Sequence, residues 1–214
     1  MNQPTTPYTN DLDRLLGRSQ ILRLQAERAG LTATIKAAND GHVPPADRPT
    51  GTDAMTTRAR LAELDVIIPE AVQAHRTRVA GLATNRLDDL ADGHKLDAHG
   101  RDLLEAMAAL TVDAGAGDAI DAAAGWRRAR PAGRQTWGLP ILLAEGDTER
   151  ELALLRALSP QGRLSKEKLI VLDHLNSDDR ADDWMAGRSP SIAAWVLASV
   201  LDVDMFPGQE GGER

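Results

Sequence analysis

The sequence contains no cysteine, and this absence excludes several classes of protein. Without thiols there is no disulfide framework, no cysteine-ligated zinc or iron–sulfur cluster and no thiol nucleophile. Aromatic residues are also scarce, at 3% of 214 residues, whereas there are 34 Ala and 28 Leu. Because alanine and leucine favour helices while aromatic and β-branched residues favour sheets, the composition predicts a mostly helical fold.

Long apolar runs are missing as well. The longest is Ile192–Ala198, seven residues, whereas a membrane-spanning helix needs about 18 to 20. The first ten residues are polar, with Pro4 and Pro7, and lack the charged and apolar regions of a secretory signal. We therefore expect a cytoplasmic protein that has no membrane partner.

Positive charge is in deficit. The 25 basic and 32 acidic residues give a net charge of −7, opposite in sign to the footprint of a nucleic-acid-binding protein. Arginine outnumbers lysine 21 to 4, a bias that indicates a GC-rich bacterium or its phage. The overall charge therefore favours a protein partner over nucleic acid.

A long helical hairpin is predicted over residues 11–92, after a disordered N-terminus at residues 1–10. Its first helix runs from Asp11 to about Ala38, with apolar residues at three-to-four spacing and Asn10 as its N-cap. A proline-rich loop follows. The second helix starts near Asp53 and reaches about Ala91, as one helix bent by Pro69 or as two abutting helices. Two such helices most simply pack antiparallel.

A compact bundle of short helices is predicted over residues 97–206, followed by a disordered tail at 207–214. The helix starts are marked by capping residues, such as Thr148 with Glu151 and Ser189 before Pro190. The fold class is therefore all-α, a long N-terminal helical hairpin followed by this bundle. The helices are expected at 97–111, 118–126, 148–158, 165–175, 178–186 and 190–201.

The basic patch near the middle of the chain is a candidate partner-binding site. Guanidinium groups beside aromatic rings can grip phosphates, stack on bases or bind carboxylates. In an acidic chain we favour carboxylates, of the protein itself or of a partner. The patch consists of Arg127, Arg128, Arg130 and Arg134, beside Trp126 and Trp137.

An acidic cluster is the main candidate metal site. Asp173, His174, Asp178 and Asp182 are residue types that ligate hard divalent cations. Aspartates on different faces of one helix diverge, however, so we interpret the cluster as favourable charge at a helix start and a solvated face. His94 and His99 are interpreted as surface histidines, and His75, in an apolar stripe, as a hydrogen-bonded core imidazole.

The helices expected at 178–186 and 190–201 have the lengths of a helix-turn-helix. The second has no Lys, Arg, Asn or Gln in the segment 191–201 to reach base edges. Seven Asp and two Arg between Asp173 and Asp204 would also repel phosphate. We therefore interpret this helix as a buried core element, with Ile192, Trp195, Val196 and Val200 facing inward.

No nucleophile elbow, phosphate-binding loop or dinucleotide fingerprint occurs in the sequence. This leaves enzymatic activity open but favours a protein without it, and no cofactor is expected. The leading hypothesis is a non-enzymatic interaction or assembly protein, a helical component of a larger bacterial or phage complex. Its partner is another protein or itself, as a homo-oligomer. The alternatives are a nucleic-acid-associated regulator using Arg127–Arg134 and a metal-dependent hydrolase at the Asp173–Asp183 cluster.

Overall fold

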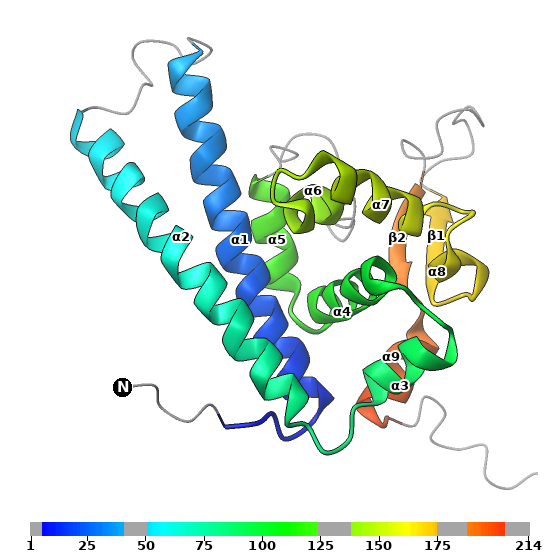
Figure 1. Cartoon of the computed structure of the whole chain (residues 1–214). Helices are drawn as coiled ribbons and strands as arrows, with labels where there is room; N and C mark the ends of the chain where they lie inside the picture. Colours follow the sequence, from blue (N-terminus) through cyan, green and yellow to red (C-terminus); the bar gives the residue numbers. More distant parts are fainter. Residues whose placement is uncertain (1–5, 41–50, 124–137, 175–187, 204–214) are drawn as a thin grey trace, which may run out of the picture.

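The computed structural model describes residues 6–40, 51–123, 138–174 and 188–203, and its longest elements form the expected helical hairpin. Helix α1 (Asp11–Asn39) and helix α2 (Gly51–Ala80) run antiparallel (Figure 1). The side chain of Asn10 caps α1 by accepting a hydrogen bond from the Asp13 amide at 2.9 Å. The fold class predicted from composition and spacing is thereby confirmed.

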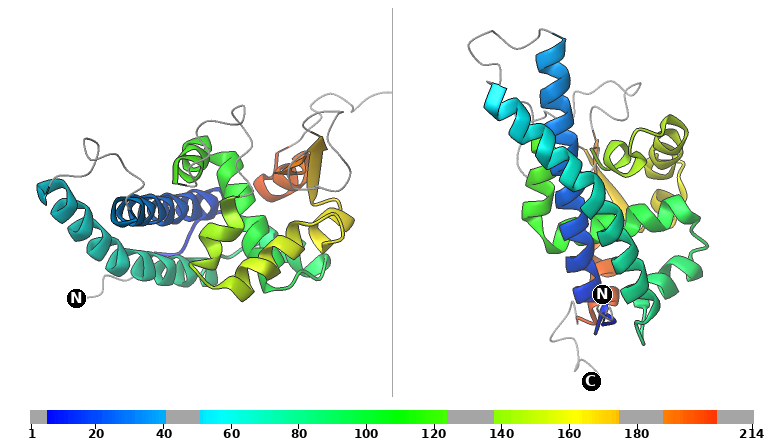
Figure 2. Two further views of the ribbon diagram at one scale, coloured as in Figure 1. Left: turned by 90° about the horizontal axis from the view of Figure 1, so that it is seen from above. Right: turned by 60° about the vertical axis from the view of Figure 1, so that its left-hand side comes forward.

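The second predicted helix is two helices. Helix α2 continues across Pro69, with a visible curve in Figure 2, and ends at Ala80. After a short turn comes helix α3 (Arg86–Gly93), capped by Asn85, whose side chain accepts a hydrogen bond from the Asp88 amide. Because α3 packs against the body of the molecule, it does not extend the hairpin.

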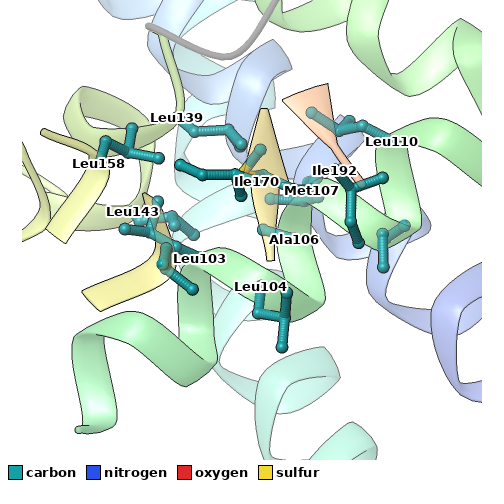
Figure 3. Packing of buried hydrophobic residues seen from close by; sticks show 14 of the residues in the cluster. Leu103, Leu104, Ala106, Met107, Leu110, Leu139, Leu143, Leu158, Ile170 and Ile192 are labelled. Atoms are coloured by element: carbon teal, nitrogen blue, oxygen red, sulfur yellow. The ribbon is translucent and has the colours of Figure 1, made fainter. Parts of the chain in front are cut away.

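Helix α4 (Ala98–Val112) lies at the centre of the body. Its side chains Leu103 and Leu104 are completely buried, and Met107 is nearly so (Figure 3). It contacts α1 and most of the short elements around it. These elements are α5 (Ala114–Ala123), α6 (Gly138–Ala144), α7 (Thr148–Leu158), α8 (Arg163–Lys166) and α9 (Ala194–Leu201).

One helix has another capping residue than the sequence predicts, and one starts at another residue. Helix α7 has the predicted bounds, but Asp147 rather than Thr148 caps it, accepting from the amides of Glu149 and Arg150. Helix α5 begins at Ala114, four residues before Asp118, although glycines at 115 and 117 are poor helix formers. Packing of α5 against α1 outweighs this weak local preference.

The predicted helix over 165–175 is wrong. Helix α8 ends at Lys166, Lys168 takes a left-handed φ of 57°, and strand β1 (Ile170–His174) follows. Strand β1 pairs antiparallel with β2 (Arg188–Ile192), with Ile170 opposite Ile192. Both isoleucines are buried in the main core, so pairing and burial together select the strand over the helix (Figure 3).

The last predicted helix also starts later than expected. Pro190 lies in β2 opposite Leu172, not at a first helical position, and α9 begins at Ala194. Val196 and Val200 are buried, as predicted, but Trp195 is 40% exposed and does not face the core. The helix predicted at 178–186 lies outside the part of the chain that the structure describes.

None of the helices in the described ranges is long and apolar enough to cross a bilayer. This agrees with the absence of long apolar runs in the sequence.

We predict that Leu103→Ala lowers the free energy of unfolding by about 2–5 kcal/mol, because it leaves a cavity at the centre of the body. Chemical denaturation followed by circular dichroism measures the change. Leu152→Ala, at a side chain that is 49% exposed on α7, is the control and should change stability by less than about 0.5 kcal/mol. Equal losses in the two variants would contradict the assignment of the core to α4.

Candidate functional site

The hairpin projects beyond the body as an arm (Figure 2). We call residues 27–39 of α1 and 54–66 of α2 the distal arm. Leu64 is its only buried side chain. Its two helices are joined by exposed ion pairs, from Arg60 to Glu27 at 2.7 Å and from Arg28 to Asp65 at 2.7 Å. Exposed ion pairs contribute little to stability. The distal arm therefore has neither strong ion pairs nor the buried apolar side chains that stabilise the body.

An apolar seam runs along the solvent-facing side of α2. Its members follow each other at steps of four, three and four residues, the spacing of the contact positions in a coiled coil. All four are exposed, Met55 by 73% and Val66 by 59%. Leu64 and Ile68 point the opposite way and are buried. We call these residues the α2 seam: Met55, Ala59, Ala62 and Val66.

Sequence reasoning missed the α2 seam. The apolar stripe that contains His75 runs through Leu64 and Ile68, and this is the stripe that α2 buries. The four-three-four pattern was visible in the sequence as a second apolar stripe. Only the structure shows that this second stripe has no covering element among the residues described.

A buried polar network holds the base of the arm to the body. The Tyr8 hydroxyl lies 2.8 Å from His75 Nδ1, and His75 Nε2 lies 3.2 Å from Glu105 Oε1. Arg14 Nε donates to the same Glu105 oxygen at 2.6 Å. His75 is thus the hydrogen-bonded core imidazole that its position in the stripe predicted. Tyr8 is also buried, although it lies in the segment for which we expected disorder.

The network shifts the acidity of Glu105. Burial by itself would raise the pKa of this carboxyl group, since it disfavours the charged form. The hydrogen bond from His75 and the charges of Arg14 and Arg18 outweigh burial and lower the pKa to about 2. Glu105 is therefore a carboxylate at neutral pH, and it serves as the shared acceptor for side chains from α1 and α2.

A cleft of about 850 Å³ opens beside this network, between α2 and the body. Its charged groups are mostly paired: Asp102 accepts from Arg18 at 2.6 Å and from Arg150 at 2.8 Å. The remaining carboxylates Asp65 and Glu145 are bonded to Arg28 and Gln25. Among the described lining residues, each carboxylate thus has a hydrogen-bond or ion-pair partner.

The structure describes only some of the candidate site residues that the sequence indicated. Asp173 and His174 lie in β1, and Asp178 and Asp182 lie outside the described residues. No group of three metal-binding side chains occurs within the described ranges. The whole predicted partner-binding patch lies outside them as well: Trp126, Arg127, Arg128, Arg130, Arg134 and Trp137.

The two histidines near the start of α4 do not form a ligand pair. His94 Nδ1 lies 3.1 Å from a carboxylate oxygen of Glu167, whereas His99 lines the cleft. Both are partly exposed, which agrees with the interpretation of surface histidines.

We predict that Glu105→Gln lowers the free energy of unfolding by about 1–3 kcal/mol at neutral pH, because it removes the nearer of the two carboxylates that pair with the buried Arg14 guanidinium and leaves Asp88 at 3.1 Å as the other. Because the pKa of Glu105 is lower in the native protein than its ordinary value of 4.5, the carboxylate stabilises the native protein fully at pH values above 4.5. This contribution fades as the pH falls towards 2. The difference between wild type and variant should therefore shrink over this acidic range.

Denaturation at a series of pH values measures this effect. Glu70→Gln is the control, since Glu70 is an exposed carboxylate on α2 outside the α2 seam. A gap that stays constant down to pH 2 would contradict the proposed role of the Glu105 charge.

Comparison with known proteins gives one family. The family model described as "Winged helix domain, variant" matches residues 1–206, almost the whole chain. No curated protein and no solved structure matches the chain. The antiparallel pair β1–β2, which follows the helices α7 and α8, is consistent with the wing of such a domain. The chain belongs to this family of variant winged helix domains.

Proposed function

We propose that this protein is a non-enzymatic interaction and assembly module that acts in the cytoplasm, as a component of a bacterial or phage complex. Its arm packs the α2 seam against a helix of another copy of the chain. The observation that carries the proposal is the seam itself, four apolar residues at coiled-coil spacing that face solvent on a projecting helix.

The chemistry of the seam supports a helical partner. Ala59 and Ala62, at its centre, let a second helix approach closely, while Met55 and Val66 supply larger apolar contacts at its ends. Met55 is also unbranched and adapts its shape to a partner surface. A flat apolar strip of this kind fits another helix better than it fits a small molecule.

The charges beside the seam support a second copy as the partner. Arg58 and Glu63 occupy the positions that flank the contact residues on opposite sides. In coiled coils these flanking positions select the partner by pairing opposite charges. Arg58 has no ion pair within the described residues, so it is available to meet a carboxylate of a second chain.

We predict that the wild-type protein forms a concentration-dependent oligomer, and that Val66→Asp shifts it to monomer by placing a charge in the seam. Light scattering across a dilution series measures the molar mass. Leu152→Asp changes an exposed leucine on α7, 49% accessible, and is the matched control that should keep the oligomer.

Cross-linking locates the contact. Because the chain has no cysteine, Met55→Cys introduces a single reactive thiol at the tip of the arm, and a thiol-specific cross-linker should yield covalent dimers. Leu152→Cys should yield few. A monomer at all concentrations, or equal cross-linking at both positions, would overturn the proposal of self-assembly through the arm.

The family match favours one further proposal, a nucleic-acid-associated regulator. Here Arg127, Arg128, Arg130 and Arg134 would neutralise phosphates, so binding should weaken steeply with salt and fall when the four are changed to alanine. A mobility-shift titration with duplex DNA tests this. No binding at low salt would remove the proposal.

A further inference from the structure

A second surface lies on the body, away from the arm. The turn between α3 and α4 lies near the end of α7 and the start of α8 (Figure 1). Residues of these segments line a hollow of about 430 Å³. Its volume is within the range of about 300–1,000 Å³ that is usual for binding pockets. Three cationic side chains and one carboxylate line it. The carboxylate, Asp97, accepts a hydrogen bond from the Gly100 amide as the N-cap of α4, and we call the cations the cationic rim: Lys95, Arg156 and Arg163.

Positive charge is concentrated around this hollow, although the chain as a whole is acidic. Three of the four lysines are in these segments, namely Lys95, Lys166 and Lys168. Residues 155–168 contain four basic side chains and one acidic side chain, in a protein with a net charge of −7. Sequence reasoning missed this cluster, because its members come from segments that are about 60 residues apart.

Two of these cations, Lys95 and Arg156, are not paired with a carboxylate of the body as far as the structure describes it. Within the described ranges, Lys95 and Arg156 form no ion pair, and the one carboxylate near Arg163 is Glu167 at 3.9 Å. The arginines that join elements, such as Arg14 and Arg18, have carboxylate partners at 2.6 Å. The charges of Lys95 and Arg156 are therefore free to neutralise a negatively charged ligand, while Arg163, held by the Lys95 carbonyl, adds a third positive charge at a fixed place.

The backbone fixes the shape of the hollow. Lys95 has a left-handed φ of 51°, and its carbonyl oxygen accepts a hydrogen bond from Arg163 Nη1 at 2.9 Å. A side chain at position 162 would overlap the carbonyl of Ala157, so Gly162 lets the chain turn closely against α7. Leu164, fully buried, anchors α8 on the other side.

The base of the hollow is apolar. Ala153 and Ala157, one helical turn apart on α7, are half-buried there, and the buried side chains of Leu96 and Leu164 also line it. An apolar base below a ring of cations matches a peptide in which acidic residues flank an apolar side chain. We propose that this hollow binds an acidic peptide segment of a partner protein.

A nucleic acid fits the surface less well. Duplex DNA carries about one negative charge per 1.7 Å of its axis, so it presents phosphates over a long distance. Asp92 and Asp97 lie beside Lys95 and are exposed, and they would face some of those phosphates. A peptide can place its carboxylates on the three cations and leave these positions empty.

The test uses the full-length protein and a fluorescent peptide of repeated Glu-Asp-Leu triplets, titrated by fluorescence anisotropy at low and high salt. Wild type should bind the peptide at low salt and more weakly at high salt. The double variant Lys95→Gly, Arg156→Gln should lose affinity by on the order of tenfold or more. Glycine suits the left-handed backbone at position 95, so the variant removes charge without straining the turn.

The control is the double variant Lys36→Gln, Arg76→Gln, which removes the same charge from exposed positions on the arm. It should bind the peptide as wild type does. The rim variant should also keep the wild-type molar mass, which separates this site from the α2 seam. The proposal is overturned if wild type does not bind the peptide, if both double variants lose affinity equally, or if a duplex DNA of equal charge binds more tightly.

Discussion

The ion pair between Arg14 and Glu105 is the interaction on which the arrangement of arm and body depends. Arg14 belongs to α1, Glu105 to α4, and His75 of α2 shares the same carboxylate oxygen. Charges buried in this way cost desolvation free energy and are tolerated only when their partners are in place. The network is therefore a geometric constraint, since it requires three helices to meet at one orientation.

This constraint divides α1 into two parts with different surroundings. Its first half carries buried side chains such as Leu15 and Leu22, and it shares the core with α4. Its second half runs beside α2 without a core of its own. Helices α1 and α2 have 29 and 30 residues, whereas the average helix has about 11 to 12. Helices of this length normally provide reach or a surface for assembly. The buried base provides the stability that the distal arm lacks.

The two proposed surfaces use different physical principles. The α2 seam offers apolar area, which favours a partner of matching shape but selects its register poorly. The cationic rim offers charge and shape, which speed encounter and select among partners. The proposed assembly role requires both affinity and selectivity, and the two proposed surfaces place these properties on separate parts of the chain.

Several local features were predictable because they depend on a few neighbouring residues. Asn10 caps α1, α7 has the bounds expected from its sequence, and the alanine and leucine content is that of a helical protein. Caps and helix propensities act within one turn of the chain, so a single sequence contains the information needed to recognise them. The antiparallel packing of two long helices follows from the short connection between them.

The strand at residues 170–174 was not predictable in the same way. A run such as Ile170, Val171 and Leu172 suits a buried helix or a strand, and the choice is made by Ile192, which lies 22 positions further along the chain and pairs with Ile170. The same holds for both candidate surfaces. The sequence alone determined that the protein is helical, acidic and built on a long hairpin, because composition and capping are local. Only the tertiary structure decided which stripe of α2 is exposed and which cations gather around one hollow, because burial and proximity arise from contacts between residues far apart in the sequence.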